Sequence, residues 1–285
     1  MINLLLAIFF SSLLYIVFKF FSKFNVNTFQ AIVLNYIVAF LVGIVLSEEK
    51  LDFYSILNKS WLFGSFILGS LFILVFNILG KTSQENGVSV ASVSSKMSMI
   101  IPILFGIFFF KESITFPKVI GILIALVAVY FTSKKEAGKV EMKNFIFPIL
   151  LFFGAGIVDT SVSYLQYTYL KESEIALFSA TTFLSAFFFG ILISIFKTIK
   201  GDFKFRGKSI IGGVFLGIPN YFSMYFLIKA LHNKNLESAT VFTLINIGVI
   251  LLSTIFGIIL FKEKLLKQNY LGIALAIIAV ILVTL

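Results

Sequence analysis

The sequence of 285 residues contains no cysteine, a single histidine, His232, and a single arginine, Arg206. Without cysteine the chain cannot form disulfides, thiolate metal sites or a cysteine nucleophile. One histidine cannot supply a histidine-rich metal site or a pair of haem ligands, so we expect no metal and no cofactor. These absences also remove the usual nucleophile, base and metal sets of catalytic centres, and we therefore expect a protein that is not an enzyme.

Charged residues are scarce as well. Asp, Glu, Lys and Arg make up 13% of the chain and hydrophobic residues 59%, whereas a soluble domain is about 25% charged and about 45–50% apolar. So little charge excludes a soluble enzyme and indicates a polytopic protein of the lipid bilayer. The net charge of +10 comes from lysines that stand between apolar runs. Basic residues in such places fix membrane topology, so we expect no nucleic-acid partner.

Long apolar runs recur along the whole chain. A helix needs about 20 mostly apolar residues to cross the bilayer, and lipid offers no partner to an unpaired backbone, so these runs predict helices. Lys19 follows the first run and no basic residue precedes it, which predicts a retained span and not a signal peptide. The ten predicted spans are residues 2–21, 28–46, 61–80, 87–110, 115–132, 145–169, 174–196, 209–231, 236–261 and 267–285.

The second half of the sequence repeats the first with a shift of 151 residues. FGIFFFKE over 105–112 aligns with FGIILFKE over 256–263, and a glycine follows each glutamate nine residues later, at Gly121 and Gly272. The repeats are residues 1–132 and 145–285, joined by a linker loop over 133–144. Each half has an odd number of spans, so the second enters the membrane from the opposite side. The sequence therefore predicts an all-α membrane protein with ten transmembrane helices, as two inverted five-helix repeats around a central cavity.

This arrangement resembles the drug/metabolite transporter superfamily, in particular its EamA-like branch of ten-helix transporters. The resemblance covers essentially the whole chain and is most specific over 108–121 and 259–272, which close the fourth and ninth spans. It implies a ten-helix fold with a central cavity. It also implies export of small metabolites, often amino acids, or of toxic compounds, and it leaves the substrate open.

Two ionisable residues lie deep inside predicted spans. Asp159 is near the middle of the sixth span, and Lys96 follows Gly87 by nine residues, which places it about 14 Å into the membrane. A charge at the centre of a span costs about 2.5–3.5 kcal/mol on insertion scales and usually marks a functional site. We expect both to line the cavity and hold the amine and carboxylate of a zwitterion, with Asp159 also as the candidate for a coupling ion, a proton. In the alternative interpretation they pair with each other or with neighbours and fix helix packing.

Serines surround Lys96 in the fourth span. Ser89, Ser92 and Lys96 recur at three- and four-residue steps and share a helix face, Ser95 adjoins them, and Pro102 removes a backbone hydrogen bond and can open the helix. Small hydroxyl residues also allow close helix packing, which is the alternative role. Further candidates for hydrogen bonds to substrate, or between helices, are Asn35, Asn77, Tyr164, Gln166, Asn220, Tyr221, Thr240, Thr243 and Asn246. Asn246 aligns with Ser95 under the 151-residue shift.

Structural roles are expected for the repeated signature. Glu112 and Glu263 end their spans beside a lysine, where a carboxylate can cap the N-terminus of the next helix. With Gly121 and Gly272 they predict a turn that holds two helices at a fixed angle. Gly213 and Gly217 form a G-x-x-x-G helix-packing motif in the eighth span.

These features predict a secondary transporter of small polar metabolites such as amino acids, an exporter in the bacterial inner membrane that works by alternating access. An exporter of drugs or other cationic compounds with the same fold is the alternative; a channel or membrane-embedded enzyme is a more remote one.

Loops after odd-numbered spans carry fifteen basic residues and the loops after even-numbered spans carry seven. By the positive-inside rule this predicts that both termini lie in the periplasm. A monomer can enclose the cavity, and a homodimer is also compatible with the sequence.

Overall fold

The computed structural model describes residues 2–47, 56–102, 104–105, 115–132, 143–200, 206–232 and 238–283. These residues form helices and connecting turns. The α-helices are α1 (Ile2–Lys23), α2 (Thr28–Val45), α4 (Leu62–Glu85), α5 (Val88–Met97), α7 (Phe116–Thr132), α8 (Lys143–Tyr169), α9 (Ile175–Ile199), α10 (Lys208–Leu231), α11 (Ser238–Phe261) and α12 (Lys267–Val283). A short 3-10 helix, η1 (Glu172–Glu174), precedes α9.

Each of the ten predicted spans contains one of these helices. Within the residues that the structure describes, seven helical segments are long and apolar enough to cross a membrane. The helices α7 and α12 have 17 residues each, or about 25 Å at 1.5 Å per residue, slightly less than the hydrocarbon core of about 30 Å. The chain is thus an all-helical, multi-pass membrane protein by length and composition.

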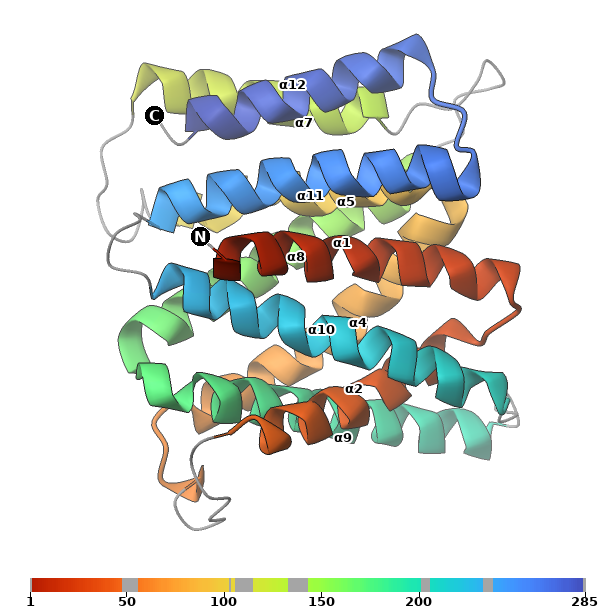
Figure 1. Cartoon of the computed structure of the whole chain (residues 1–285), viewed down its shortest axis with the longest axis vertical. Coiled ribbons are helices and arrows are strands. Elements are labelled where there is room, and N and C mark those ends of the chain that lie inside the picture. Colours follow the sequence, from red (N-terminus) through yellow and green to blue (C-terminus); the bar gives the residue numbers. More distant parts are fainter. Residues whose placement is uncertain are drawn as a thin grey trace.

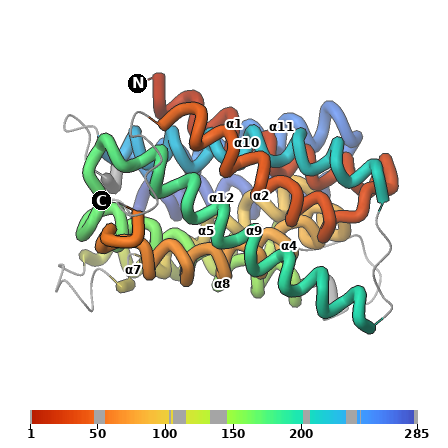
Figure 2. Tube along the Cα trace, turned by 90° about the horizontal axis from the view of Figure 1, so that it is seen from below, coloured from red at the N-terminus to blue at the C-terminus, as the bar shows by residue number. Residues whose placement is uncertain are grey.

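The helices run side by side, with both termini at one end of the bundle (Figure 1). We call this the terminal end, and the opposite end, where α1 turns into α2, the hairpin end. The pair α7 and α12 forms one edge of the bundle and the pair α2 and α9 the other. Turned by 90°, the bundle has α1 and α11 on one face and α7 and α8 on the opposite face (Figure 2). The remaining helices fill the space between.

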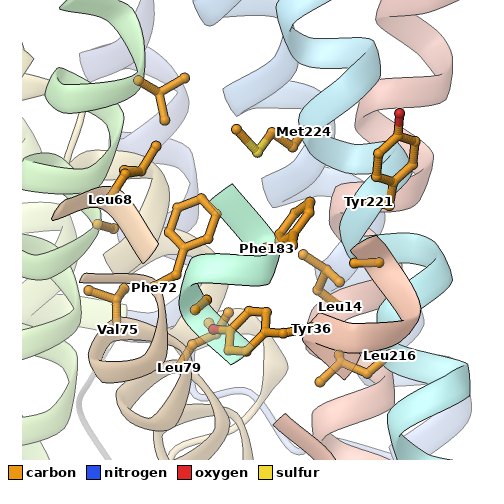
Figure 3. Close-up of a cluster of buried hydrophobic side chains, with 14 of the residues drawn as sticks. Leu14, Tyr36, Leu68, Phe72, Val75, Leu79, Phe183, Leu216, Tyr221 and Met224 are labelled. Atoms are coloured by element: carbon orange, nitrogen blue, oxygen red, sulfur yellow. The ribbon is translucent and has the colours of Figure 1, made fainter. Parts of the chain in front are cut away.

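Aromatic side chains fill the core between α1, α2, α4, α9 and α10 (Figure 3). Phe183 of α9 lies at its centre, with its ring centroid 6.1 Å from that of Tyr36 and 5.7 Å from that of Phe72. Outward-facing side chains are also apolar: Phe63 is 76% exposed. A protein that is apolar both inside and outside is suited to lipid and not to water.

Small residues allow the helices of this core to approach closely. A Cβ atom on Gly217 would lie 2.6 Å from the carbonyl oxygen of Asn35, and one on Gly213 would lie 2.5 Å from Cβ of Leu34. These glycines let α10 lie directly against the backbone of α2. The interpretation of Gly213 and Gly217 as a packing motif is thus in accord with the structure.

The fourth predicted span is interrupted. Helix α5 ends at Met97, Ser98 and Met99 form a turn, and helical residues resume at Ile100. Pro102 explains why the helix is interrupted here. Its ring clashes with the backbone carbonyl of the residue four positions earlier, which is Ser98. The prediction of one continuous helix over 87–110 is therefore wrong at this point, and Ile103 and residues 106–110 lie outside the described chain.

Asn269 fastens α12 to α7 at the hairpin end. Its Oδ1 accepts the N–H of Leu266 at 2.7 Å, and its Nδ2 donates to the carbonyls of Phe131 and Thr132, both at 3.0 Å. Three residues after Asn269, a Cβ on Gly272 would be 2.7 Å from the backbone nitrogen of Thr132. The signature glycine Gly272 therefore lies at the contact between α12 and α7. Gly121 is buried in α7.

Candidate functional site

The structure brings the two deep charges together. Asp159 lies in the middle of α8 and Lys96 in the last turn of α5, and the two side chains interact electrostatically. The Ser98 hydroxyl lies 3.4 Å from Oδ2 of Asp159 and also reaches the carbonyl of Ser95. No direct ion pair joins Lys96 to Asp159 in the described part of the chain. Both charged side chains are half-buried and thus not sealed in the core.

The end of α5 gives Lys96 a favourable setting. Helix C-terminal carbonyls carry a partial negative charge, so a cation in the last turn is stabilised. The break at Ser98 and Met99 lies inside the protein, since both residues are buried. A lysine ammonium in the last turn of α5 and a carboxylate on the facing helix α8 form a site of two opposite charges.

A tyrosine that the sequence analysis missed completes the site. Tyr15 of α1 is buried, with 3% of its surface exposed, and its hydroxyl interacts with Ser95 and lies in the field of both Lys96 and Asp159. A tyrosine in an apolar span has no charge to mark it. One signal was available, because Tyr15 aligns under the 151-residue shift with Gln166, which was a candidate.

Asn246 reaches the same break from α11. It is buried, and its Nδ2 donates to Sδ of Met99 at 3.1 Å. Ser92, by contrast, donates to the carbonyl of Ser89 at 3.0 Å, so its hydrogen is used within α5. The side chains of Thr240 and Thr243 lie outside the described part of the structure. The site described here therefore draws on α1, α5, α8 and α11.

The other amide and tyrosine candidates have different partners. Asn220 donates to Oδ1 of Asn35 at 2.7 Å, which joins α10 to α2, and Asn77 donates to the carbonyl of Ile73 at 2.6 Å within α4.

Tyr221 lies in the aromatic core (Figure 3), and Tyr164 is 43% exposed beside Tyr169. Gln166 lies 3.5 Å from Nδ1 of His232. Within the described residues, these candidates form no hydrogen bond to Lys96 or Asp159.

Glu263 caps a helix, but not the one expected. Its Oε1 accepts the N–H of Val88 at 2.7 Å, and its Oε2 accepts the Ser89 hydroxyl at 3.1 Å and lies 3.4 Å from the Ser89 N–H. The capped helix is thus α5, from the first half of the chain, whereas the expected target was the next helix, α12. The physical reason is that Lys262, with φ of 52°, turns the chain back toward Gly87. Glu112 lies outside the described residues.

Within the described segments, no group of three His, Cys, Asp or Glu side chains is close enough together to hold a metal ion. The chemistry that the site does offer is ionic recognition. One carboxylate, one ammonium and neighbouring hydroxyls can bind a small molecule with charges of both signs.

Comparisons with known proteins assign the chain to a family. The sequence model of the EamA-like transporter family matches residues 1–134 and again 146–285. An uncharacterized protein of Haemophilus influenzae is 31% identical over 285 residues, covering 98% of this chain and 96% of that protein. An uncharacterized transporter of Archaeoglobus fulgidus is 24% identical over 76% of each chain. A solved crystal structure with 16% identity shares the fold, with a TM-score of 0.62 over 99% of this chain and 94% of the other. The chain therefore belongs to the EamA-like transporter family.

Proposed function

We propose that the protein is a secondary transporter that carries a small zwitterionic metabolite, such as an amino acid, across the bacterial inner membrane, and that it exports it. The observation that carries this proposal is the meeting of Lys96 and Asp159 at the interrupted helix α5. Transporters of several folds bind substrate near the midplane, at helices that are broken there. Membership of a transporter family gives the site its context.

The two charges suit an amino acid. In this proposal Asp159 binds the ammonium group and Lys96 the carboxylate, while Tyr15 and Ser95 add hydroxyl groups beside them. A charge taken out of water needs an opposite partner. Since Lys96 and Asp159 are not joined by a direct ion pair, a zwitterion placed between them supplies one partner to each.

The two-repeat layout is part of the proposal. The family model matches each half of the chain separately. The contact of α1 with α10 corresponds, under the 151-residue shift, to the contact of α8 with α4, and both are present. The pairs α7 with α12 and α2 with α9 each join a helix to its own counterpart. Five helices in each half imply opposite orientations, as alternating access by inverted repeats requires.

Hydrogen bonds join several helices at the hairpin end of the bundle. Lys19 of α1 donates to the carbonyl of Gln84 at 3.1 Å, and the Gln84 amide donates back to the Phe18 carbonyl at 3.1 Å and to Thr28 at 2.7 Å. Glu263 adds its bond to Val88 between α11 and α5. Together these contacts join the ends of five helices.

The described residues at the terminal end also form contacts between helices. Gln166 of α8 meets His232, which follows α10, at 3.5 Å. Lys59, before α4, donates to Oε1 of Glu174 in η1 at 2.5 Å. Most basic residues between the predicted spans belong to the connections on the hairpin side, so in this proposal the hairpin end is the cytoplasmic end.

Transport by the purified protein in liposomes tests the proposal. We expect uptake of one or more radiolabelled amino acids from a panel, and loss of that uptake in Asp159→Asn and in Lys96→Met. The matched control is Lys81→Met, because Lys81 is an exposed lysine that lies over the Phe147 ring, away from the site. Normal uptake by both site variants, or equal loss in the control, would contradict the assignment.

One observation favours a second substrate class. An aromatic residue, Tyr15, lies in the field of Asp159, and a carboxylate beside an aromatic ring also suits an organic cation. An exporter of cationic compounds needs Asp159 and not Lys96. Transport of a lipophilic cation that survives Lys96→Met and is lost in Asp159→Asn identifies this second class.

A further inference from the structure

A groove of about 670 Å³ runs along the outer face of the bundle between α1 and α10. Leu13, Phe20 and Phe24 form one wall, Ile211 and Phe215 the other, and apart from Lys208 the lining is apolar. Gly212 forms part of the floor, because a Cβ there would lie 2.9 Å from Val26 and 3.1 Å from Phe21. The shape and the lining suit a hydrocarbon chain.

The groove has the depth of one lipid leaflet. It extends from Leu13, in the middle of α1, to Phe24, just past its end, which is about 16 Å at 1.5 Å per residue. Half of the hydrocarbon core is about 15 Å. The Phe24 end is at the hairpin end of the bundle, so the groove opens at headgroup level in that leaflet.

Two lysines lie at this opening. Lys208 is the first residue of α10 and lines the groove, and Lys23 is in the last turn of α1, with its Nζ 5.9 Å from the centre of the Phe20 ring. Both side chains are exposed. The N-terminus of α10, which no side chain caps, adds a partial positive charge. No acidic side chain is among the described residues that line the groove.

We propose that this groove binds one anionic phospholipid of the leaflet at the hairpin end. Its acyl chain lies between Phe20 and Phe215, and its phosphate lies between Lys23 and Lys208. Apolar walls one leaflet deep account for the chain, and the two lysines at headgroup depth account for the charge.

A second groove provides an internal comparison. It lies between α2, α4 and α9 at the terminal end, has a volume of about 540 Å³, and has Phe40, Leu62 and Phe188 in its lining. Its described lining contains no charged residue. We expect lipid in this groove to be bound without regard to headgroup charge.

Lipid binding to the purified full-length protein, followed by native mass spectrometry, tests the proposal. Phosphatidylglycerol and phosphatidylcholine with the same acyl chains are compared. At about 1 kcal/mol for each lysine, the first phosphatidylglycerol should bind about thirtyfold more tightly than phosphatidylcholine. Lys23→Gln and Lys208→Gln should each reduce this preference about fivefold. The matched control is Lys200→Gln, an exposed lysine at the end of α9 over the Phe196 ring, which should keep it.

Ile211→Trp tests the acyl chain separately. This exposed wall residue is replaced by a larger one, which fills the groove and should displace the lipid while both lysines stay in place. Equal binding of the two lipids, or an equal effect of Lys200→Gln, would overturn the proposed preference for an anionic headgroup. Full competition by glycerol phosphate alone would show a phosphate site that needs no acyl chain. It would overturn the proposal that the groove binds the lipid chain. None of these measurements depends on the transport activity.

Discussion

The carboxylate of Glu263 accepts the backbone N–H of Val88 at 2.7 Å, so a residue just past the end of α11 holds the first turn of α5. The two residues are 175 positions apart. A carboxylate at a helix N-terminus satisfies free N–H groups and favours the helix dipole. The contact fixes α5, and with it Lys96, from the opposite half of the chain.

Removal of this carboxylate should destabilise the protein. We expect Glu263→Ala to lower the free energy of unfolding by about 1–2 kcal/mol, in the range of a lost helix cap. Thermal unfolding in detergent measures it. Glu172→Ala, an exposed glutamate of η1, is the matched control and should change the stability little. Equal melting temperatures for wild type and Glu263→Ala would contradict the capping role.

Gly87 should not tolerate a side chain. Its φ of 106° lies in the region that favours glycine, and a Cβ there would be 3.0 Å from Oε1 of Glu263. We expect Gly87→Ala to cost about 1–3 kcal/mol through backbone strain. Gly207→Ala is the control, because no atom lies within 4 Å of its added Cβ. If the two variants have the same melting temperature, the predicted strain at Gly87 is absent.

Two buried tyrosines should respond differently to loss of their hydroxyls. The Tyr36 hydroxyl has no hydrogen-bond partner among the described residues, so Tyr36→Phe should leave stability unchanged or raise it, because an unsatisfied buried polar group is costly. The Tyr15 hydroxyl faces Ser95 and the two charges. We expect Tyr15→Phe to weaken substrate binding about fivefold to tenfold, the loss of one hydrogen bond of about 1 kcal/mol or slightly more. The melting temperatures of both variants without ligand measure the stability, and their shifts with ligand measure the binding.

Asn269 should be essential to the contact between α7 and α12. Asn269→Ala removes the acceptor for Leu266 and the donor to two carbonyls, and we expect a loss of about 1–3 kcal/mol. Asn269→Asp keeps the acceptor and places a carboxylate oxygen against those carbonyls, so it should not rescue the stability. Thermal unfolding of the two variants checks both statements, and full recovery in Asn269→Asp would show that only the cap at Leu266 matters.

A coupling proton on Asp159 would make transport depend on pH. We expect wild-type transport in liposomes to respond to an imposed pH gradient, and Asp159→Asn to lose this response because an amide does not take up the proton. Transport by Asp159→Asn that follows the pH gradient as the wild type does would remove Asp159 as the proton carrier.

The helices could be predicted from the sequence because a membrane span depends on local features. Each run of apolar residues ends at lysines or polar turns, and the observed bounds differ from the predicted ones by a few residues in most cases. The break in α5 was only partly predictable: Pro102 shows that a hydrogen bond is missing but not that the helix ends at Met97. That outcome depends on packing around Ser98.

The site could be predicted in part, for a similar reason. Lys96 and Asp159 are conspicuous because charges are costly inside a membrane. Tyr15 and the target of Glu263 depend on which helices are neighbours, and periodicity along the chain does not contain that information. Asn35 and Asn220 resemble site residues in the sequence, yet Asn220 donates to Asn35 across α10 and α2, and Asn35 donates to the carbonyl of Ile32.

The interruption of α5 also has a consequence for how the helix end can sense Asp159. A helix that stops at Met97 inside the protein must find other partners for its last carbonyls. Here the Ser98 hydroxyl donates to the carbonyl of Ser95, and the Met99 nitrogen lies 3.4 Å from the carbonyl of Lys96. The same Ser98 hydroxyl lies 3.4 Å from Asp159. One hydroxyl thus links the carboxylate of α8 to the end of α5, so that a ligand which neutralises Asp159 also changes the bonding of that helix end.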